Sequence, residues 1–192
     1  MGAPRRKPIK REVERALPLT DGALRLAVIS DTHSKPHPNA HGLVKDLAPD
    51  AILHGGDVGD LAVLDAFRDI AEVIAVRGNI DERTQLPDFV TIRVVEDRDT
   101  RLTILLTHVA VNGPRIRADA ARWAHARRAS LIVCGHSHVP FLGRDRGLTV
   151  LNAGSIGPRR FHLPIVFAVI EIANRKLSLR HIDCETGEPW AP

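Results

Sequence analysis

Short apolar runs that end in residues able to bind metal constrain this chain more than any other feature. The first run covers residues 24–30, and two more follow at residues 51–54 and 72–76. Continuous apolar runs of this length are typical of buried strands. Residues 61–68, between the second and third runs, have apolar residues at helical spacing. Strands that alternate with helices in this way predict βαβ units and a parallel sheet.

The second half of the chain has a different pattern, in which strands follow one another directly. Residues 89–95 and 102–106 predict paired strands with a turn near residues 97–99. Residues 115–128 are rich in alanine and arginine and lack glycine and proline, which predicts a helix. Further strands are expected at residues 131–134, 148–151, 165–172 and 176–182. The expected fold class is α/β: a four-layer α-β-β-α sandwich in which two mixed β-sheets face each other and are flanked by helices.

The length of the chain fits one globular domain. A chain of 192 residues can bury a core without disulfides, and Cys134 lies in an apolar run where a buried free thiol is expected. Residues 1–22 are basic and show no sustained period, so we expect a flexible N-terminal extension ahead of a single domain at residues 23–192. No apolar stretch approaches the ~20 residues of a membrane helix. The N-terminus lacks the apolar core of a secretory signal, so a cytoplasmic location without membrane contact is expected.

The charge of the chain says little about its partners. A formal net charge of +4 favours attraction to anions, including phosphates and nucleic acids. Only 4% of the residues are aromatic and none is tyrosine, which argues against a surface that stacks on bases. Trp123 is expected to take part in the packing of a helix rather than to stack on a nucleobase. Nucleic acid stays open as a partner without support from the sequence, and a small phosphate ester is the expected substrate.

Side chains that can bind metal follow five apolar runs, at the points where the expected strands end. In chain order they are Asp31, His33, Asp57, Asn79, His108, His136 and His138. In an open α/β sheet, ligands sit just beyond the carboxyl ends of the strands, so five such loops can meet at one place. The Asp-x-His and His-x-His spacings put two donors on the same side of an extended segment.

The chemistry of these seven donors is consistent. They are carboxylates, imidazoles and one amide, without thiolates, and this set suits manganese, iron, nickel, cobalt or zinc. Seven donors are too many for one tetrahedral ion, but they fit two ions ~3.5–4 Å apart that share one carboxylate. Two-metal sites of this kind support in-line attack on phosphorus. The sequence therefore predicts a dinuclear metal centre for phosphoester hydrolysis.

The order Asp-x-His, Gly-Asp, Gly-Asn, Thr-His and Gly-His-x-His resembles the calcineurin-like metallophosphoesterase superfamily. More narrowly, residues 24–182 are similar to its small bacterial and archaeal phosphodiesterases. The resemblance implies one divalent ion held by Asp31, His33 and His138. It implies a second ion held by Asn79, His108 and His136, with Asp57 bridging the two. Manganese is the expected ion, and nickel, iron, zinc, cobalt or magnesium are alternatives.

The resemblance also implies the activity, which is phosphodiester hydrolysis by a hydroxide that bridges the two ions and attacks phosphorus in line. The residues expected to take part in catalysis are Asp57, Asn79, His108 and Asp81. Ile80 stands where many superfamily members carry a histidine that serves as a general acid. Esters with good leaving groups are therefore expected to be favoured. Val109 and Ala110 replace the Gly-His that usually follows Thr-His, which is expected to alter the substrate pocket.

Other functions of the same fold stay open. A nuclease or a cyclic-nucleotide esterase would use the same metal centre, and substrate choice lies in loops whose shape the sequence does not give. The superfamily also includes a retromer subunit with little or no catalysis, so a protein-interaction scaffold is the alternative from another class. That subunit departs from the complete ligand set, whereas all seven donors are present here. A homodimer is implied by the resemblance alone.

Several residues near the motifs have two interpretations. Asp60 and Asp81 could each accept the outer N–H of a ligand histidine, or cap a turn or helix. Arg159 and Arg160 could bind a phosphate through their guanidinium groups or form an exposed pair on a loop. His54 lies on an apolar run and is expected either to be structural or to support a ligand.

Overall fold

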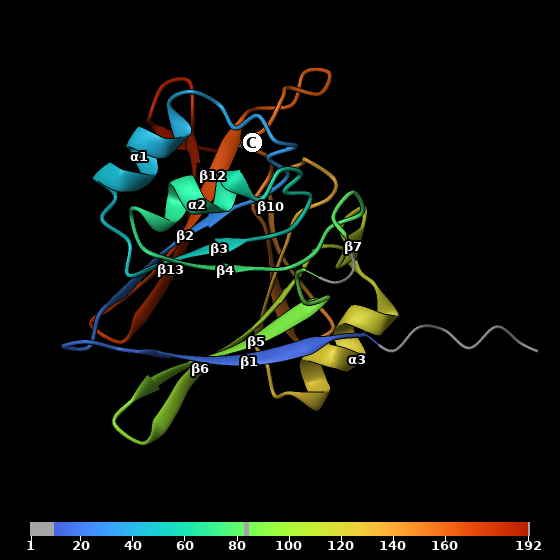
Figure 1. Cartoon of the computed structure of the whole chain (residues 1–192). Coiled ribbons are helices and arrows are strands. Elements are labelled where there is room, and N and C mark those ends of the chain that lie inside the picture. The colour runs from blue at the N-terminus through green and yellow to red at the C-terminus, as the bar shows by residue number, and fades with distance from the viewer. Residues whose placement is uncertain (1–9, 83–84, 192) are drawn as a thin grey trace, which may run out of the picture.

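The computed structural model describes residues 10–82 and 85–191 and arranges them around two six-stranded sheets that face each other (Figure 1). In spatial order, the first sheet contains β14 (Pro189–Trp190), β13 (Lys176–Asp183), β12 (Val166–Ala173), β2 (Leu24–Ile29), β3 (Ala51–His54) and β4 (Glu72–Ala75). The second sheet contains β1 (Glu12–Pro18), β5 (Phe89–Glu96), β6 (Asp99–Thr107), β9 (Leu131–Cys134), β11 (Leu148–Asn152) and β10 (Phe141–Asp145). A separate short hairpin joins β7 (Val111–Asn112) to β8 (Arg115–Ile116).

Both sheets are mixed. In the first sheet β2, β3 and β4 pair in parallel, while β12 pairs antiparallel with both β2 and β13. In the second sheet β6, β9 and β11 pair in parallel, while β5 and β10 pair antiparallel with β6 and β11. The helices of the described residues are α1 (Ala40–Asp46), α2 (Ala62–Arg68) and α3 (Ala118–Ala126).

Apolar side chains fill the spaces between four layers. Successive strand residues point to opposite faces. On β2, Val28 therefore joins the core between the sheets, and Ile29 joins the core beneath the helices. Phe67 of α2 packs in that outer core with residues of α1, and Ala124 of α3 packs on the outer face of the second sheet. Figure 1 shows α1 and α2 on one side of the molecule and α3 on the other. The predicted α-β-β-α sandwich is confirmed.

The expectation of a flexible extension at residues 1–22 is wrong for Glu12–Pro18, which form β1 at the edge of the second sheet. This strand pairs in parallel with β5 over its whole length. Only one of its seven side chains is buried, so no apolar run marks it in the sequence. Contacts from a distant part of the chain hold it, including an ion pair between Glu12 and Arg127. Residues 1–9 lie outside the described residues.

Other elements differ from the prediction for local reasons. The helix expected at residues 115–128 starts at Ala118, because Arg115 and Ile116 pair with β7 to form a hairpin. The sequence did not indicate α1, β10 or β14. Gly42 lies inside α1 and Gly143 inside β10, and glycine weakens the pattern of either element.

The prediction of a buried thiol is confirmed. Cys134 is fully buried, and burial raises the pKa of its thiol to about 12. Cys184 is buried as well, and burial likewise raises its pKa to about 12. Both thiols are therefore held in the protonated form at neutral pH. Across residues 10–82 and 85–191, no helix is both long and apolar enough to cross a membrane.

Five strand ends from both sheets meet on one side of the molecule, because backbone hydrogen bonds continue past the strands. Beyond β2 and β3, the backbone N–H of His33 donates to the carbonyl of Asp57 at 3.0 Å. Beyond β6 and β9, the N–H of Gly135 donates to the carbonyl of His108 at 3.1 Å. One bond joins the two groups of loops, from the N–H of His136 to a carboxylate oxygen of Asp31 at 2.9 Å. The loops are therefore fixed relative to one another across both sheets.

Candidate metal centre

Six of the seven donors form two clusters among the described residues. Asp31, His33 and His138 make up the first cluster, and Asp57, His108 and His136 make up the second. In each cluster the three potential ligand atoms lie within 4.8 Å of one another. The first group contains the three residues of the first implied ligand set, and the second contains His108 and His136 of the other set together with Asp57.

The first cluster is built around the carboxylate of Asp31, which is fully buried. Its Oδ2 accepts hydrogen bonds from the Ser30 hydroxyl at 2.6 Å and from the N–H of His136 at 2.9 Å. Its Oδ1 faces Nε2 of His138 at 3.3 Å, and that nitrogen lies 3.2 Å from Nε2 of His33. One carboxylate oxygen is thus held by the protein, and the other points to the two imidazoles.

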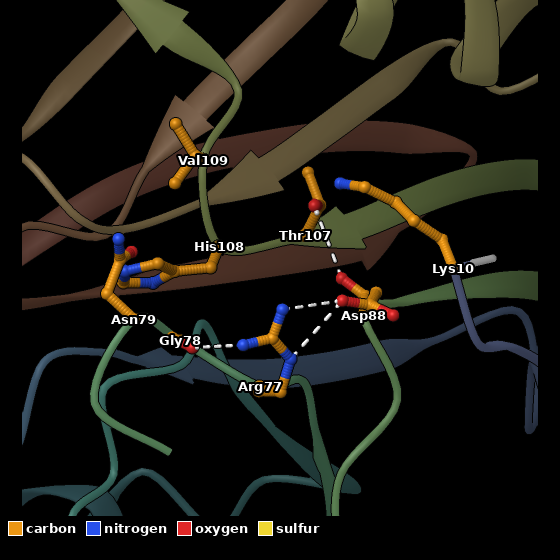
Figure 2. A pocket seen from close by; sticks show the side chains of 8 residues that line it. All are labelled: Lys10, Arg77, Gly78, Asn79, Asp88, Thr107, His108 and Val109. Atoms are coloured by element: carbon orange, nitrogen blue, oxygen red, sulfur yellow. Dashed lines mark hydrogen bonds and ion pairs between the residues drawn. The ribbon is translucent and has the colours of Figure 1, made fainter. Parts of the chain in front are cut away.

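The second cluster is oriented by contacts behind each donor. Nδ1 of His108 lies 2.8 Å from the carbonyl oxygen of Gly55 and donates its hydrogen there, so Nε2 is directed into the cluster. That Nε2 lies 3.4 Å from Oδ1 of Asp57. The rings of His108 and His136 meet edge to face with centroids 5.0 Å apart. Asn79 lines the same cavity as His108, next to it in Figure 2, and is thus placed to add its amide oxygen.

Asp57 lies between the two clusters. Its Oδ1 faces His108 and also accepts the backbone N–H groups of Asn79 at 2.5 Å and Ile80 at 3.1 Å. Its Oδ2 lies 3.8 Å from Nε2 of His33 in the first cluster. A carboxylate in this position can be shared by two ions.

The electrostatics keep both carboxylates charged and act in opposite directions on the histidines. Burial opposes the charge of Asp57, but the close contact with His108 and the backbone N–H groups of Ile80 and Asn79 hold the pKa of this carboxyl far below its usual range. Burial likewise opposes the charge of Asp31, and contacts with His138 and His108 bring its pKa below the ordinary value. Burial lowers the pKa of His33 and His136. Burial opposes a charge on His108 as well, but the contact with Asp57 and the charge of Asp31 raise the pKa of His108 above its ordinary value. The site therefore combines carboxylate anions with two histidines that tend to be neutral and one whose proton a bound ion would displace.

Unpartnered buried atoms show that the site fits a cation. Among the described residues, Oδ1 of Asp31 and Nε2 of His108 are buried without a hydrogen-bond partner, as is Nδ1 of His138. Leaving a buried polar group unsatisfied costs about 1–3 kcal/mol. The atoms of Asp31 and His108 point into the first and second cluster, where a divalent ion in each cluster would satisfy them. Their donor types suit a borderline transition metal.

The backbone is strained at the same residues. Five of the seven donors have left-handed φ angles: Asp31 at 54°, His33 at 46°, Asp57 at 53°, His136 at 73° and His138 at 60°. Non-glycine residues in such sparsely populated regions cost of order 1–3 kcal/mol each and persist only where the surroundings impose them. This concentration of strain marks the loops as a functional site rather than ordinary connections.

Asp81 positions the loops of the second cluster. Its carboxylate accepts the backbone N–H groups of Val58 at 3.2 Å, Gly59 at 2.9 Å and Gly78 at 2.7 Å. These groups lie next to Asp57 and Asn79, and within the described residues no histidine bonds to Asp81. Asp60 accepts only the N–H of Ala62, at 3.0 Å, which is a turn contact at the start of α2. In the described part of the chain, Asp60 and Asp81 therefore both bind backbone N–H groups and not the outer N–H of a ligand histidine.

We expect Asp81→Ala to destabilise the metal-free protein by about 2 kcal/mol, because three backbone N–H groups lose their acceptor. Metal affinity should fall as well, since these loops carry Asp57 and Asn79. Urea unfolding and metal titration would measure the two effects. Asp60→Ala is the matched control and should cost about 0.5–1 kcal/mol, because it removes one hydrogen bond at an exposed turn. Equal losses in the two variants would contradict the role assigned to Asp81.

The Asn-Ala-Gly-Ser segment at residues 152–155 supports the site through hydrogen bonds to its loops. Asn152 donates from Nδ2 to the carbonyl of Gly135 at 2.8 Å, and the Ser155 hydroxyl donates to the carbonyl of Asp31 at 3.0 Å. His54 supports the other side: it is fully buried, and burial lowers its pKa to about 4. Its Nδ1 accepts the N–H of Gly56 at 3.1 Å, so His54 is a structural neutral imidazole. Ser30, the carbonyl of Gly55 and Gly135 were not anticipated as supports, because hydrogen bonds between distant loops leave no pattern in one sequence.

The two adjacent arginines have different positions. Nη2 of Arg160 lies 3.2 Å from Nε2 of His33, so its guanidinium reaches the first cluster. Arg159 turns away, donating to the carbonyl of Leu163 at 3.0 Å and pairing with Glu185. Of the pair, Arg160 is the one placed to meet a phosphate at the centre.

The fold and the convergence of these donors define a metal-dependent phosphoesterase domain. Residues 24–175 match the family model of the calcineurin-like phosphoesterase superfamily domain. The chain belongs to this superfamily, which confirms the resemblance seen in the motifs.

Known proteins agree with this assignment. A probable metallophosphoesterase of Methanocaldococcus jannaschii is 33% identical over 140 residues, which cover 70% of this chain and 69% of the relative. The structure of a predicted phosphoesterase from Streptococcus pneumoniae matches with a TM-score of 0.63 and 21% identity, covering 89% of this chain and 95% of that one. The structure of Vps29 complexed with zinc from Entamoeba histolytica matches with a TM-score of 0.67 and 22% identity, covering 87% and 96%. The two structures show that the fold is shared.

Proposed function

We propose that this phosphoesterase is a phosphodiesterase that depends on two divalent metal ions. The observation that carries the proposal is the convergence of the donors at one edge of both sheets, with Oδ1 of Asp31 and Nε2 of His108 buried and unpartnered there. Such atoms are retained when they serve a ligand.

The proposed ligand sets are Asp31, His33 and His138 for one ion and Asn79, His108 and His136 for the other, with Asp57 shared. When bound, the two ions polarise the phosphoryl oxygens and lower the pKa of a water molecule, so that hydroxide is available near neutral pH. The protein orients these ligands through Ser30, Gly55 and the backbone contacts of Asp57.

Residues around the centre support an ester with a weakly basic leaving group. Ile80 follows Asn79, and its side chain is 53% exposed and has no proton to donate. Arg160 reaches His33 and is placed to contact a phosphoryl oxygen. The leaving group therefore has no side-chain acid at Ile80 to protonate it, which favours good leaving groups.

A cavity beside His136 supports a diester over a monoester. It has a volume of about 480 Å³ and is lined largely by apolar side chains, including Val109, Val111, Val139 and Phe141. A phosphodiester has a second organic group that can enter such a cavity, whereas a monoester has none. Val109, one of the departures from the superfamily pattern, lies in this wall.

Manganese is the ion that we propose, because the mixed imidazole, carboxylate and amide donors suit borderline and hard metals. Zinc is the second candidate, since the sorting protein from Entamoeba histolytica is described in complex with zinc. The cytoplasmic location and the homodimer stay predictions from the sequence and the resemblance.

The test is hydrolysis by protein stripped of metal and reloaded separately with manganese, nickel, zinc or magnesium. We expect manganese to restore cleavage of bis-p-nitrophenyl phosphate, with a higher kcat/KM than for p-nitrophenyl phosphate. A preference for the monoester would keep the metal centre but reject the phosphodiesterase. Cleavage of oligonucleotides or cyclic nucleotides at higher kcat/KM than the nitrophenyl ester would favour the nuclease or cyclic-nucleotide esterase.

A non-catalytic scaffold is the second candidate, and the structural similarity to Vps29 favours it. This candidate predicts that folded, metal-loaded protein turns over none of these esters with any of the four ions. It also predicts that the protein retains a stable partner through purification. The complete donor set favours catalysis over this alternative.

A further inference from the structure

A second cavity shares Val109 with the apolar one and has His108 in its wall. It has a volume of about 340 Å³, and its wall contains Asn79 and His108 together with Lys10, Arg77, Gly78, Asp88, Thr107 and Val109. Figure 2 shows Lys10 at the end of the cavity opposite Asn79 and His108. The cavity therefore runs from the proposed second metal site to a lysine.

The charges in this cavity leave one cation without a partner. Arg77 is neutralised, since Nε and Nη2 donate to Oδ1 of Asp88 at 3.2 and 2.8 Å. Lys10 forms no ion pair or hydrogen bond with any described residue, and its Nζ lies 4.0 Å from the centre of the Trp123 ring. Burial lowers the pKa of this ammonium group, while Asp88 and Asp119 act on it only from a distance. Two cations and one carboxylate leave the cavity with a net positive charge.

The position of Lys10 is set by a stack of aromatic and cationic groups. The rings of Trp123 and Phe89 stack with their centroids 5.3 Å apart. The guanidinium of Arg127 lies 4.6 Å from the centroid of the Phe89 ring. Arg127 also pairs with Glu12 on β1. These contacts fix the start of β1 on α3 and so deliver Lys10 to the cavity. Residue 10 lies outside the residues 24–175 that match the superfamily model.

We propose that this cavity binds a second phosphate group of the substrate, beside the phosphate at the metal centre. The inference rests on the proposed function for the scissile phosphate. A compact anion with several acceptor oxygens would satisfy the free donors of Lys10. The preferred substrates would then be phosphate esters that carry a further phosphate close to the bond that is cleaved.

The probe for this subsite is methylenediphosphonate, whose P–C–P link is not hydrolysed, and inorganic phosphate is the comparison. Binding of each to manganese-loaded protein would be measured by calorimetry, with metal content checked after each titration. In Lys10→Met, which keeps an unbranched side chain of similar length without the charge, methylenediphosphonate should bind about tenfold more weakly than in the wild type. Inorganic phosphate should bind as before, and Lys10→Arg should restore the diphosphonate. Lys45→Met, on the exposed surface of α1, is the matched control and should change neither.

Equal weakening of both anions in Lys10→Met, or no weakening of the diphosphonate, would overturn the subsite. Thermal unfolding of each variant separates loss of the fold from loss of the charge. The binding measurement needs no turnover. Protein that binds the diphosphonate through Lys10 but cleaves no ester would keep the subsite and reject the phosphodiesterase. Protein that cleaves the diester but binds both anions regardless of Lys10 would keep the phosphodiesterase and reject the subsite.

Discussion

Replacing Asp57 by asparagine should reduce turnover of bis-p-nitrophenyl phosphate by about 10³-fold, which corresponds to about 4 kcal/mol of transition-state stabilisation. Asparagine has the same size, and its Oδ1 can still accept the N–H groups of Asn79 and Ile80. It removes the negative charge that lies between His108 at 3.4 Å and His33 at 3.8 Å. Two ions would then share no anion, so the bound metal should fall from two ions to one or none per chain.

Metal content after dialysis, measured by mass spectrometry, tests this result independently of activity. Asp60→Asn is the matched control, because Asp60 makes a turn contact with Ala62 and lies outside both clusters. Circular dichroism would show that both variants fold. Two ions per chain and near-normal turnover in Asp57→Asn would show that Asp57 is not the shared ligand.

Gly78→Ala is the second change with a large expected effect, and we expect it to destabilise the metal-free protein by about 3 kcal/mol. A Cβ on Gly78 would lie 2.0 Å from the backbone nitrogen of Asp57 and 2.2 Å from its Oδ1. A backbone atom cannot move aside by changing rotamer, so the loops after β3 and β4 must separate. That movement would also displace Asp57 and Asn79 and weaken metal binding.

Gly42→Ala provides the control for this effect. Gly42 lies in α1, and a Cβ there would have no atom within 4 Å. Alanine should stabilise the helix by about 0.5–1 kcal/mol, because it removes the flexibility of glycine in the unfolded chain. Urea unfolding of both metal-free variants gives the two free energies of unfolding. If Gly78→Ala lowered the free energy of unfolding by less than about 0.5 kcal/mol, as an ordinary surface substitution does, the loops would accommodate the methyl group.

The positions of strands along the chain could be predicted wherever burial on both faces produces a continuous apolar run. Residues 51–54 and 131–134 are of this kind, and both are strands with every side chain buried. The same reasoning fails for β1, because an edge strand whose side chains are mostly exposed needs no apolar residues. It fails for α1 as well, where seven residues around a glycine give a weak helical pattern.

The candidate donors could be predicted because each lies within four residues of the end of a strand, and the strands of the two sheets bring these ends together. What supports them could not be predicted. Arg160 reaches His33 across 127 residues of sequence, and the Asn152 amide holds the loop of Gly135 through a hydrogen bond. Lys10 reaches the cavity because β1 pairs with β5, which the sequence alone does not reveal.

The first cluster joins the two sheets, because Asp31 and His33 follow a strand of the first sheet and His138 follows a strand of the second. His33 and His138 are 105 residues apart in the chain, so the unfolded polypeptide brings them together only at a large cost in entropy. An ion held there would act as a reversible cross-link between the halves of the sandwich. Ligands that bind only the folded state add stability with concentration, about 2.7 kcal/mol at 100 times their dissociation constant. The thermal stability of this protein would then report the free metal concentration around it, even when no substrate is present.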